Sequence, residues 1–496
     1  MSVWPETLNA DNWILRDHLR VTSDRVALRT DDRNVTFGEL DALASGFAAA
    51  LLDNGVERQD RVLIVLPDGP QYAAAVFGIF RIGAVVVMVN PELSREALVG
   101  ILNRARATAA FVDDIYRDAF QAALDEIGIE TAVLDPATIE PGDIGTVATS
   151  PEDPAMWLFS GGTTGVPKAV AQTHRSLANT TLLYGQGSLV LVPDDITISV
   201  PKLYFGYAMG SNLLFPLSVG ASSVLFTEHS TPEVLFDRIE KHRPTVMVNV
   251  PSAINQMVSD PAAANRDLSS LRLATSAGEA LPETLYHRWK TLFGVELLDG
   301  LGTAEMWHIF ITNNVGNVRP GTLGKVVPGF EIKACDEEGV EVGPGEVGRL
   351  WVRGDSLGVG YFEDPELTAE AFRGEWFVGG DLVSIDEAGY VTHRGRADDA
   401  IKIKGKWFRP QEVESVLLEN EAVREVAVVA VSDEAGLSKP VAFVVAHPRV
   451  TEQELIDWVL ARLEAYKHPR RVYFVDKLPQ THLGKVDRSA LKRLAR

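Results

Sequence analysis

The sequence of 496 residues predicts an α/β protein with a large N-terminal domain of βα-layered sheets plus a β-rich subdomain, and a small mobile α+β C-terminal domain. Three observations support this prediction. Strand and helix patterns alternate between residues 61 and 302, short strand patterns with tight turns follow, and a shorter mixed pattern ends the chain. Repeated βα units favour sheets with helices packed on their faces. We expect the two domains to span residues 1–396 and 397–496.

The N-terminal domain shows its βα pattern most clearly at residues 61–90. There, the apolar runs RVLIVLP and AVVVMVN flank the helix-forming run GPQYAAAVFGIFRIG, which predicts a strand, a helix and a strand. The same alternation returns at residues 244–258 and 271–302. From about Thr322 the pattern changes to short strands and tight turns, as in GFEIKACDEEGVEVGPGEVGRLWVRG. This part predicts the β-rich subdomain.

The C-terminal residues predict a smaller α+β unit. Its expected elements are a helix from Pro410, strands at 424–431 and 439–447, a helix from Glu452 to about Leu463, and a strand at 470–476. Residues 462–496 contain ten Lys and Arg residues but only three acidic residues. Such a basic segment suits a small anionic ligand, and a solvated basic surface is the alternative.

The composition excludes several classes of function. The formal net charge of −21 argues against nucleic acid as the main partner, because phosphate binding needs a basic surface. No run approaches the ~20 apolar residues of a membrane span. Cys335 is the only cysteine and the histidines form no HExxH pair, which argues against a disulfide scaffold and a protein metal cage. We expect a cytoplasmic protein that binds neither nucleic acid nor membranes.

Residues 160–168, with the sequence SGGTTGVPK, form the most informative motif. The motif combines three glycines that let the backbone turn and present N–H groups, three hydroxyl groups and one positive charge. These residues are Gly161, Gly162 and Gly165, then Ser160, Thr163 and Thr164, and finally Lys168. The combination suits a triphosphate, with a flexible surface loop as the alternative. It is not a Walker loop, because Pro167 precedes the lysine.

Four further polar residues are candidates for binding ATP and Mg²⁺. Glu305 follows the apolar strand VELL, where a parallel sheet places ligands outside its carboxyl edge, and it could hold Mg²⁺ on ATP. Asp381 offers a carboxylate for ribose hydroxyls, and Arg396 could join it. Lys485 lies in a glycine-flanked loop near the C-terminus. Each of these residues is also typical of a solvated surface.

The order and spacing of six motifs resemble the adenylate-forming superfamily of acyl-CoA synthetases, carrier-protein adenylation domains and luciferases. The motifs are SGGTTGVPK, SAGEALP, GLGTAEM, EWFVGGD, GRADDAIKIKGKWFRPQEVE and PQTHLGKVDR, and the resemblance covers nearly the whole chain. Within this superfamily, PKLYFGYAMG and GLGTAEMWHIFITN are most similar to the benzoate-CoA ligase branch. The resemblance implies an acid–thiol ligase that uses ATP, Mg²⁺ and CoA.

The resemblance also implies a role for each candidate residue. Lys485 and Glu305 would be catalytic, with Glu305 binding Mg²⁺, Asp398 would be the hinge, and Gly405 would line the CoA passage. ATP would contact Ser160, Gly161, Gly162, Thr163, Thr164, Gly165, Lys168, Gly278, Glu279, Ala280, Asp299, Gly300, Leu301, Gly302, Thr303, Asp381 and Arg396. The acid substrate would contact Phe205, Tyr207, Ala277, Gly302 and His308.

One residue departs from the superfamily pattern. Ala304 replaces the usual threonine before Glu305, and Thr303 stands one place earlier. Either Thr303 substitutes through a local backbone shift, or the hydroxyl contact with the α-phosphate is absent. Losing this hydrogen bond would cost ~1–3 kcal/mol of transition-state stabilisation, which slows an enzyme without abolishing its reaction.

The implied reaction is ATP-dependent activation of benzoate or a substituted benzoate to aryl-AMP, followed by transfer to the thiol of CoA. Residues 201–210, PKLYFGYAMG, contain no acid, so the expected pocket suits an aromatic ring whose only charge is its carboxylate. Three alternatives stay open: an aryl-acid adenylating enzyme that loads a separate carrier protein, an aliphatic acyl-CoA synthetase, and a catalytically impaired nucleotide- and acyl-binding protein. The ring substituents and the oligomeric state stay open as well.

Overall fold

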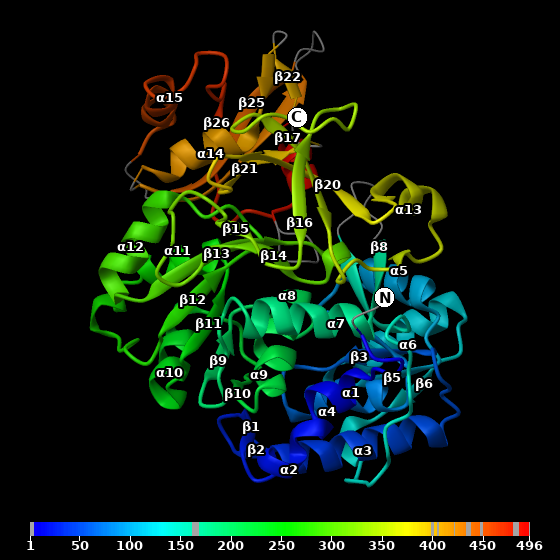
Figure 1. Ribbon diagram of the computed structural model, residues 1–496. Helices are drawn as coiled ribbons and strands as arrows, with labels where there is room; N and C mark the ends of the chain where they lie inside the picture. Colours follow the sequence, from blue (N-terminus) through cyan, green and yellow to red (C-terminus); the bar gives the residue numbers. More distant parts are fainter. Residues whose placement is uncertain are drawn as a thin grey trace.

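The computed structural model describes residues 4–160, 168–397, 401–403, 406–420, 422–432, 438–446, 450–479 and 486–495 (Figure 1). It confirms the predicted α/β class. A seven-stranded, a nine-stranded and a five-stranded sheet precede a small C-terminal part that contains two further sheets. In the described part of the chain, no helix is both long and apolar enough to cross a membrane.

The seven-stranded sheet has the order β18-β8-β7-β4-β3-β5-β6. Its parallel strands are continuous apolar runs, which suits a sheet covered on both faces. Alternate residues of one strand enter two separate cores: Val62 packs with helices α3 and α4, and Leu63 packs with α5 and α6. The elements are α3 Phe37–Asp53, β3 Arg61–Val65, α4 Pro70–Arg81, β4 Val85–Met88, α5 Arg95–Ala105, β5 Ala109–Val112, α6 Asp114–Ile127, β6 Ala132–Leu134, β7 Pro154–Ser160, β8 Lys168–Thr173 and β18 Gly360–Tyr361.

The nine-stranded sheet has the order β15-β14-β13-β12-β11-β9-β10-β1-β2 and shares a core with the first sheet. Leu177 of helix α7 and Leu273 of β12 belong to the same apolar cluster as Val62. The elements are α1 Ala10–Ile14, α2 Leu19–Thr22, β1 Val26–Arg29, β2 Asn34–Thr36, α7 His174–Thr180, β9 Ile196–Ser199, α8 Gly206–Met209, α9 Phe215–Ser218, β10 Ser222–Val224, α10 Pro232–His242, β11 Val246–Asn249, α11 Pro251–Ser259, β12 Leu273–Ser276, α12 Glu283–Phe293, β13 Glu296–Gly302, β14 Ile309–Thr312 and β15 Lys325–Val326.

The β-rich subdomain predicted after Thr322 is an antiparallel sheet. Its strands follow the order β16-β17-β20-β19, and β21 also pairs with β20. Alternating burial along β17 shows that one face of this sheet is packed and the other is more open. The elements are β16 Glu331–Cys335, β17 Val347–Arg353, α13 Pro365–Ala371, β19 Phe372–Arg373, β20 Trp376–Ile385 and β21 Val391–Arg396.

The C-terminal part has the predicted α+β composition, with two boundaries that differ from the prediction. Its elements are β22 Ile401–Ile403, β23 Lys406–Phe408, α14 Pro410–Leu418, β24 Val423–Ser432, β25 Ser438–Ala446, α15 Glu452–Leu460, β26 Val472–Phe474 and α16 Arg488–Leu494. Helix α15 ends before Leu463, and the Arg462 N–H bonds the carbonyl of Val459 three residues back, in a tighter turn than that of an α-helix. Strand β26 is shorter than residues 470–476, since only three of its residues pair with β25.

The C-terminal part lies against the end of the N-terminal sheets (Figure 1). Helix α14 packs beside β21, and α11 packs beside β24. The Asn255 side chain of α11 donates a 2.6 Å hydrogen bond to the carbonyl of Arg424 in β24. These contacts close one side of the region where the carboxyl ends of β12 and β13 meet β21.

Candidate active site

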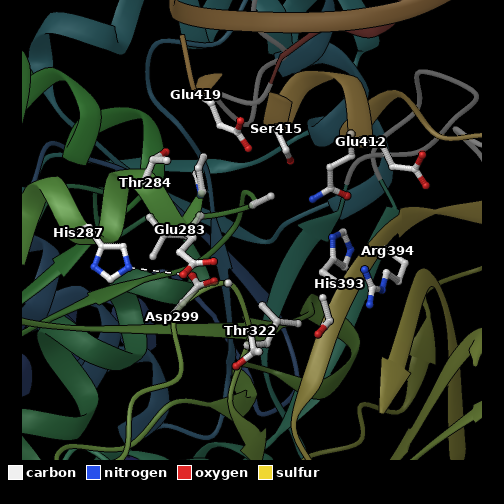
Figure 2. A pocket seen from close by; sticks show the side chains of 17 residues that line it. Glu283, Thr284, His287, Asp299, Thr322, His393, Arg394, Glu412, Ser415 and Glu419 are labelled. Carbon is white, nitrogen blue, oxygen red and sulfur yellow. Dashed lines mark ion pairs between the residues drawn. The ribbon is translucent and has the colours of Figure 1, made fainter. Parts of the chain in front are cut away.

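A cavity of about 560 Å³ lies where the loops after β12 and β13 face β21 and helix α14. Figure 2 shows Asp299 and Thr322 on one side of the cavity and Ser415 and Glu419 on the opposite side. His393 and Arg394 of β21 line a third side. Parallel sheets place ligands at this carboxyl edge of their strands. The predicted ATP residues Ala280 and Asp299 therefore face a cavity of ligand size.

Asp299 brings a buried carboxyl group with unused hydrogen-bonding capacity to this cavity. Its side chain is 7% exposed, and Oδ1 has no hydrogen-bond partner within the described residues. Burial raises the pKa of Asp299 well above its ordinary value, so the neutral acid is favoured. A neutral carboxyl group can both donate and accept, and a buried group of this kind normally has a partner. The site therefore fits a ligand with donors and acceptors on one edge, such as adenine.

Two side chains of the neighbouring strand, those of Arg396 and His393, contact the carboxylate of Asp381. It pairs with Arg396 across β20 and β21, and Arg396 Nη1 lies 3.6 Å from Asp381 Oδ1. His393 Nε2 lies 3.1 Å from the same oxygen. The sequence analysis missed His393, because plain strand alternation places positions 393 and 396 on opposite faces. A β-bulge, with Gly395 at φ +101°, brings both side chains to Asp381.

Glu305 forms the centre of a second polar group. Its side chain is 7% exposed, and its Oε1 accepts a 2.7 Å hydrogen bond from the hydroxyl of Tyr361. Lys168 Nζ lies 5.4 Å from the centre of the Tyr361 ring. In the described residues, Glu305 Oε2 accepts no hydrogen bond, which leaves one hard oxygen for a cation. Tyr361 was missed because its partners are 56 and 193 positions away in the sequence.

The short turn Ala304–Met306, which contains Glu305, shows what the Thr303 hydroxyl contacts. Thr303 Oγ1 accepts a hydrogen bond of 3.3 Å from the Met306 N–H and so caps this turn. Gln172 Nε2 donates a 2.6 Å bond to the Ala304 carbonyl. The Thr303 hydroxyl thus already serves the backbone as an acceptor, and Gln172 was not anticipated from the sequence.

Two of the predicted acid-binding residues, Tyr207 and His308, lie together in a buried aromatic region. Tyr207 shares a 2.6 Å hydrogen bond with Thr275 Oγ1, and His308 Nε2 lies 3.0 Å from the Tyr207 carbonyl. Burial lowers the pKa of His308 to about 4, so the ring is neutral near pH 7. Because a carbonyl only accepts, Nε2 carries the proton. Nδ1 is then a buried acceptor, and it has no partner among the described residues.

Aromatic rings and small residues shape the rest of this region. The His308 ring lies 4.7 Å from Phe215 and 5.4 Å from Tyr184, measured between ring centres. A Cβ added to Gly210 would lie 2.6 Å from His308 Cδ2. Ala277, at 3% exposure, directly follows β12, and Phe205 lies beside Tyr204 with ring centres 4.6 Å apart. No carboxylate is among the residues that contact His308 or Tyr207 in these interactions.

The remaining ATP candidates lie in two places. Gly278, Glu279 and Ala280 form the loop after β12, where Glu279 accepts hydrogen bonds from the N–H and hydroxyl of Ser252 at 3.1 and 3.2 Å. Gly300, Leu301 and Gly302 end β13, and Leu301 packs partly against the main core. The candidates outside the described residues are Gly161, Gly162, Thr163, Thr164, Gly165, Asp398, Gly405 and Lys485, and the side chain of Ser160 is also outside them.

The residues present fit Mg²⁺ bound mainly through phosphate groups. In the described ranges, no cluster of three or more His, Cys, Asp or Glu side chains can form a metal cage. Mg²⁺ commonly binds through one or two carboxylates together with substrate phosphates and water. Glu305 Oε2 is an oxygen of that type, and Tyr361 contacts both Glu305 and Lys168.

Comparison with known proteins shows the family to which the chain belongs. Residues 15–362 match the family of AMP-binding enzymes, and residues 412–485 match the AMP-binding enzyme C-terminal domain. A benzoate–CoA ligase of Thauera aromatica is 36% identical, over 98% of this chain and 96% of that protein. The p-hydroxybenzoic acid–AMP ligase FadD22 of Mycobacterium tuberculosis (strain CDC 1551 / Oshkosh) is 35% identical, over 92% of this chain and 65% of that protein. The crystal structure of the anthranilate CoA ligase AuaEII in complex with anthranoyl-AMP matches with a TM-score of 0.94 and 34% identity, covering 99% of this chain and 98% of that one.

Proposed function

Because the chain belongs to the family of AMP-binding enzymes, we propose that it is an AMP-forming aryl-CoA ligase for benzoate or a substituted benzoate. The observation that carries this proposal is the uncharged aromatic region around Tyr207 and His308, which adjoins the strand that leads to Asp299 and Glu305. A buried aromatic region of this kind favours a planar ring over an amino acid, whose ammonium group would need a carboxylate partner.

In the proposed first step, the acid carboxylate attacks the α-phosphorus of ATP and pyrophosphate leaves, which gives the mixed anhydride aryl-AMP. The site must bring a carboxylate and phosphate groups together, so its main work is positioning and charge neutralisation. Lys168, with residues 160–165, would hold the β- and γ-phosphates. Glu305 would hold Mg²⁺, which supplies positive charge to the phosphates.

The nucleoside would occupy the cavity of Figure 2. Asp299, as a neutral buried acid, would hydrogen-bond the adenine edge, with residues 278–280 along one face of the ring. Gly300, Leu301, Gly302 and Thr303 would line the path between the adenine and the phosphates. The Asp381 carboxylate, held by His393 and Arg396, would accept hydrogen bonds from the ribose hydroxyls.

The acid would bind among Phe205, Tyr207, Ala277, Gly302 and His308. His308 is neutral and its Nδ1 is a buried acceptor, so it would accept a hydrogen bond from a hydroxyl or amino group on the ring. An unpaired buried acceptor costs about 1–3 kcal/mol, which favours a substrate that pairs it. This supports a hydroxy- or aminobenzoate among the substrates.

The second step needs a different arrangement, because the thiol of CoA must reach the acyl carbon of aryl-AMP and AMP must leave. We assign residues 1–396 to the ATP- and acid-binding domain and residues 397–496 to a lid domain that turns about Asp398. Lys485 would neutralise the carboxylate and α-phosphate in the first step and move away in the second, when Gly405 lines the CoA passage. The basic residues of the segment 462–496 would then lie near anionic CoA.

A second candidate function is the loading of an aryl group onto a carrier protein. It is favoured by the similarity to a p-hydroxybenzoic acid–AMP ligase, of which this chain covers 65%. The two functions share the first step and differ only in the thiol that accepts the aryl group. A third candidate function is that of a catalytically impaired binding protein, because Ala304 replaces the usual threonine.

We also propose a cytoplasmic location, supported by the single cysteine, Cys335.

Acid-dependent exchange of labelled pyrophosphate into ATP tests the proposal. Benzoate and its 2-, 3- and 4-hydroxy and amino derivatives are compared with cyclohexanecarboxylate, hexanoate and phenylalanine, and CoA thioester is then assayed. Exchange and thioester with benzoates support the proposal. Exchange without CoA thioester favours carrier loading, exchange only with hexanoate favours aliphatic activation, and no exchange with any acid favours the impaired binding protein.

A further inference from the structure

Tyr361 connects two groups that lie far apart in the sequence and together on the phosphate side of the site. Its hydroxyl donates to Glu305 Oε1 at 2.7 Å, and its ring lies 5.4 Å from Lys168 Nζ. Lys168 is the first residue of β8 and the last residue of the motif SGGTTGVPK, and Glu305 lies in the turn after β13. One side chain thus contacts both charged candidates that the proposed function assigns to Mg²⁺·ATP.

The surroundings of Tyr361 fix its ring. Strand β18 pairs with β8, with Tyr361 opposite Val170 and Gly360 opposite Ala171. The Tyr361 N–H donates to Thr368 Oγ1 at 3.0 Å, and Phe372 packs against the ring at 5.5 Å between centres. The residue is 9% exposed. The backbone contacts and the packing of Phe372 restrict where the Tyr361 hydroxyl can lie, and a carboxylate with one oxygen bound to that hydroxyl is restricted in its rotation.

Resting on the proposed function, we propose that Tyr361 is a positioning residue that orients the Glu305 carboxylate for the Mg²⁺ of Mg²⁺·ATP. The Tyr361 hydroxyl engages Oε1 and leaves Oε2 as the oxygen for the metal. Preorganising a charged ligand in this way saves the cost of ordering it when the metal arrives. Removing the hydroxyl frees the carboxylate to rotate, and the metal then binds less tightly.

The hydroxyl and the ring of Tyr361 have separate roles. The phenol hydroxyl donates its hydrogen bond to the carboxylate oxygen Oε1 of Glu305. The ring acts separately, because its face attracts the Lys168 ammonium whether or not the hydroxyl is present.

The chain offers a matched control for this role. Tyr286 is also 9% exposed, and its hydroxyl donates to Glu296 Oε1 at 2.8 Å. This second tyrosine–glutamate pair joins α12 to the start of β13 and belongs to neither the acid nor the phosphate side of the site. Tyr361→Phe and Tyr286→Phe therefore remove the same kind of hydrogen bond from two tyrosines of equal exposure.

The test measures ATP binding by calorimetry at increasing Mg²⁺, and again in EDTA. Tyr361→Phe is expected to raise the half-saturating Mg²⁺ concentration roughly tenfold, the effect of losing one hydrogen bond to a charged group, with ATP affinity in EDTA unchanged. Tyr286→Phe is expected to leave both values unchanged. Glu305→Gln is expected to raise the Mg²⁺ requirement at least as much, and adding Tyr361→Phe to Glu305→Gln is expected to change nothing more.

The results distinguish a failure of the Glu305 assignment from a failure of the proposal for Tyr361. If Glu305→Gln leaves the Mg²⁺ requirement unchanged, the assignment of Glu305 to Mg²⁺ fails and the proposal for Tyr361 falls with it. If Glu305→Gln raises the requirement and Tyr361→Phe does not, the proposal alone is overturned. Thermal unfolding checks that the variants fold, with Tyr361→Met as a second variant that lacks the hydroxyl. If neither Tyr361 variant folds, the residue serves the fold and the proposal is overturned as well.

Discussion

His393 Nε2 lies 3.1 Å from Asp381 Oδ1, across the paired strands β20 and β21. The contact depends on the β-bulge at Gly395, which turns His393 and Arg396 toward one carboxylate. Because His393 also lines the cavity, it links the proposed ribose site to the packing of the β-rich subdomain. The same contact gives the first prediction.

His393→Phe is expected to raise the KM for ATP about 5- to 20-fold, with a much smaller change in kcat. The substitution keeps a flat ring and removes one hydrogen bond to a charged group, which is worth about 1.5–3 kcal/mol at most. Steady-state kinetics at saturating acid measures both constants.

The matched control is His242→Phe. His242 Nε2 lies 3.1 Å from Asp31 Oδ1 at the end of α10, in a second histidine–aspartate pair away from the cavity. This control is expected to leave the KM for ATP unchanged. Equal effects of the two substitutions, or none from His393→Phe, would contradict the role given to His393.

Gly210→Ala is expected to raise the KM for the acid and leave ATP binding unchanged. The added Cβ would lie 2.6 Å from both His308 Cδ2 and Phe215 Cζ, so the rings of the proposed acid site must shift. Such overpacking typically costs 1–3 kcal/mol, roughly. Gly100→Ala in α5, where nothing lies within 4 Å, is the control and is expected to change neither binding step. An unchanged KM for the acid in Gly210→Ala would place the acid elsewhere.

Acid is expected to destabilise the protein through His174. Burial lowers the pKa of His174 to about 4, below the ordinary value of 6.5, and the Ala10 N–H donates to its Nδ1 at 3.1 Å. The neutral ring therefore stabilises the fold fully above pH 6.5, and this contribution is lost as the pH falls from 6.5 toward 4. The loss is about 1.4 kcal/mol per pH unit, since the unfolded chain binds the proton first.

His174→Gln keeps an acceptor for the Ala10 N–H and removes the titrating ring. Urea unfolding between pH 7.5 and 4.5 measures the free energy of unfolding of both proteins. The gap between wild type and variant is expected to be constant above pH 7 and to shift in favour of the variant below pH 6. A gap that does not depend on pH would show that His174 is not the group that titrates.

Lys485→Ala is expected to abolish acid-dependent pyrophosphate exchange and to leave most of the thioester formation from supplied aryl-AMP. A single ammonium group is needed where carboxylate and α-phosphate meet, and the thiol attack on the anhydride does not need it. Rapid-quench measurement of each half-reaction separates the two effects. Equal losses in both half-reactions would contradict the proposed hinge movement at Asp398.

Much of the fold could be predicted from the sequence because the signals are local. The strand, helix and strand at 61–90 appear as β3, α4 and β4, since largely apolar runs flank a helix with a proline in its first turn. The predicted end of α15 was wrong by a few residues, because the tighter turn at Arg462 cannot be recognised from the apolar pattern.

The candidate site was only partly predictable, because many of its contacts join residues that lie far apart in the sequence. The glycine-rich motif and single acids can be found by residue type, whereas their supporting residues depend on contacts across the fold. Tyr361 reaches Glu305 through the pairing of β18 with β8, and Gln172 reaches the Ala304 carbonyl from β8. His393 depends on a bulge that strand alternation does not reveal. Each of these three residues supports a candidate that the sequence had already indicated.

Isotope transfer from the acid tests the proposed chemistry most directly. Benzoate labelled with ¹⁸O in both carboxyl oxygens is incubated with ATP, Mg²⁺, CoA and the protein, and the products are analysed by mass spectrometry. Attack of the carboxylate on the α-phosphorus followed by thiol attack on carbon predicts one ¹⁸O atom in each AMP that forms with a molecule of aryl-CoA. Unlabelled AMP, or label appearing in inorganic phosphate, would contradict the account.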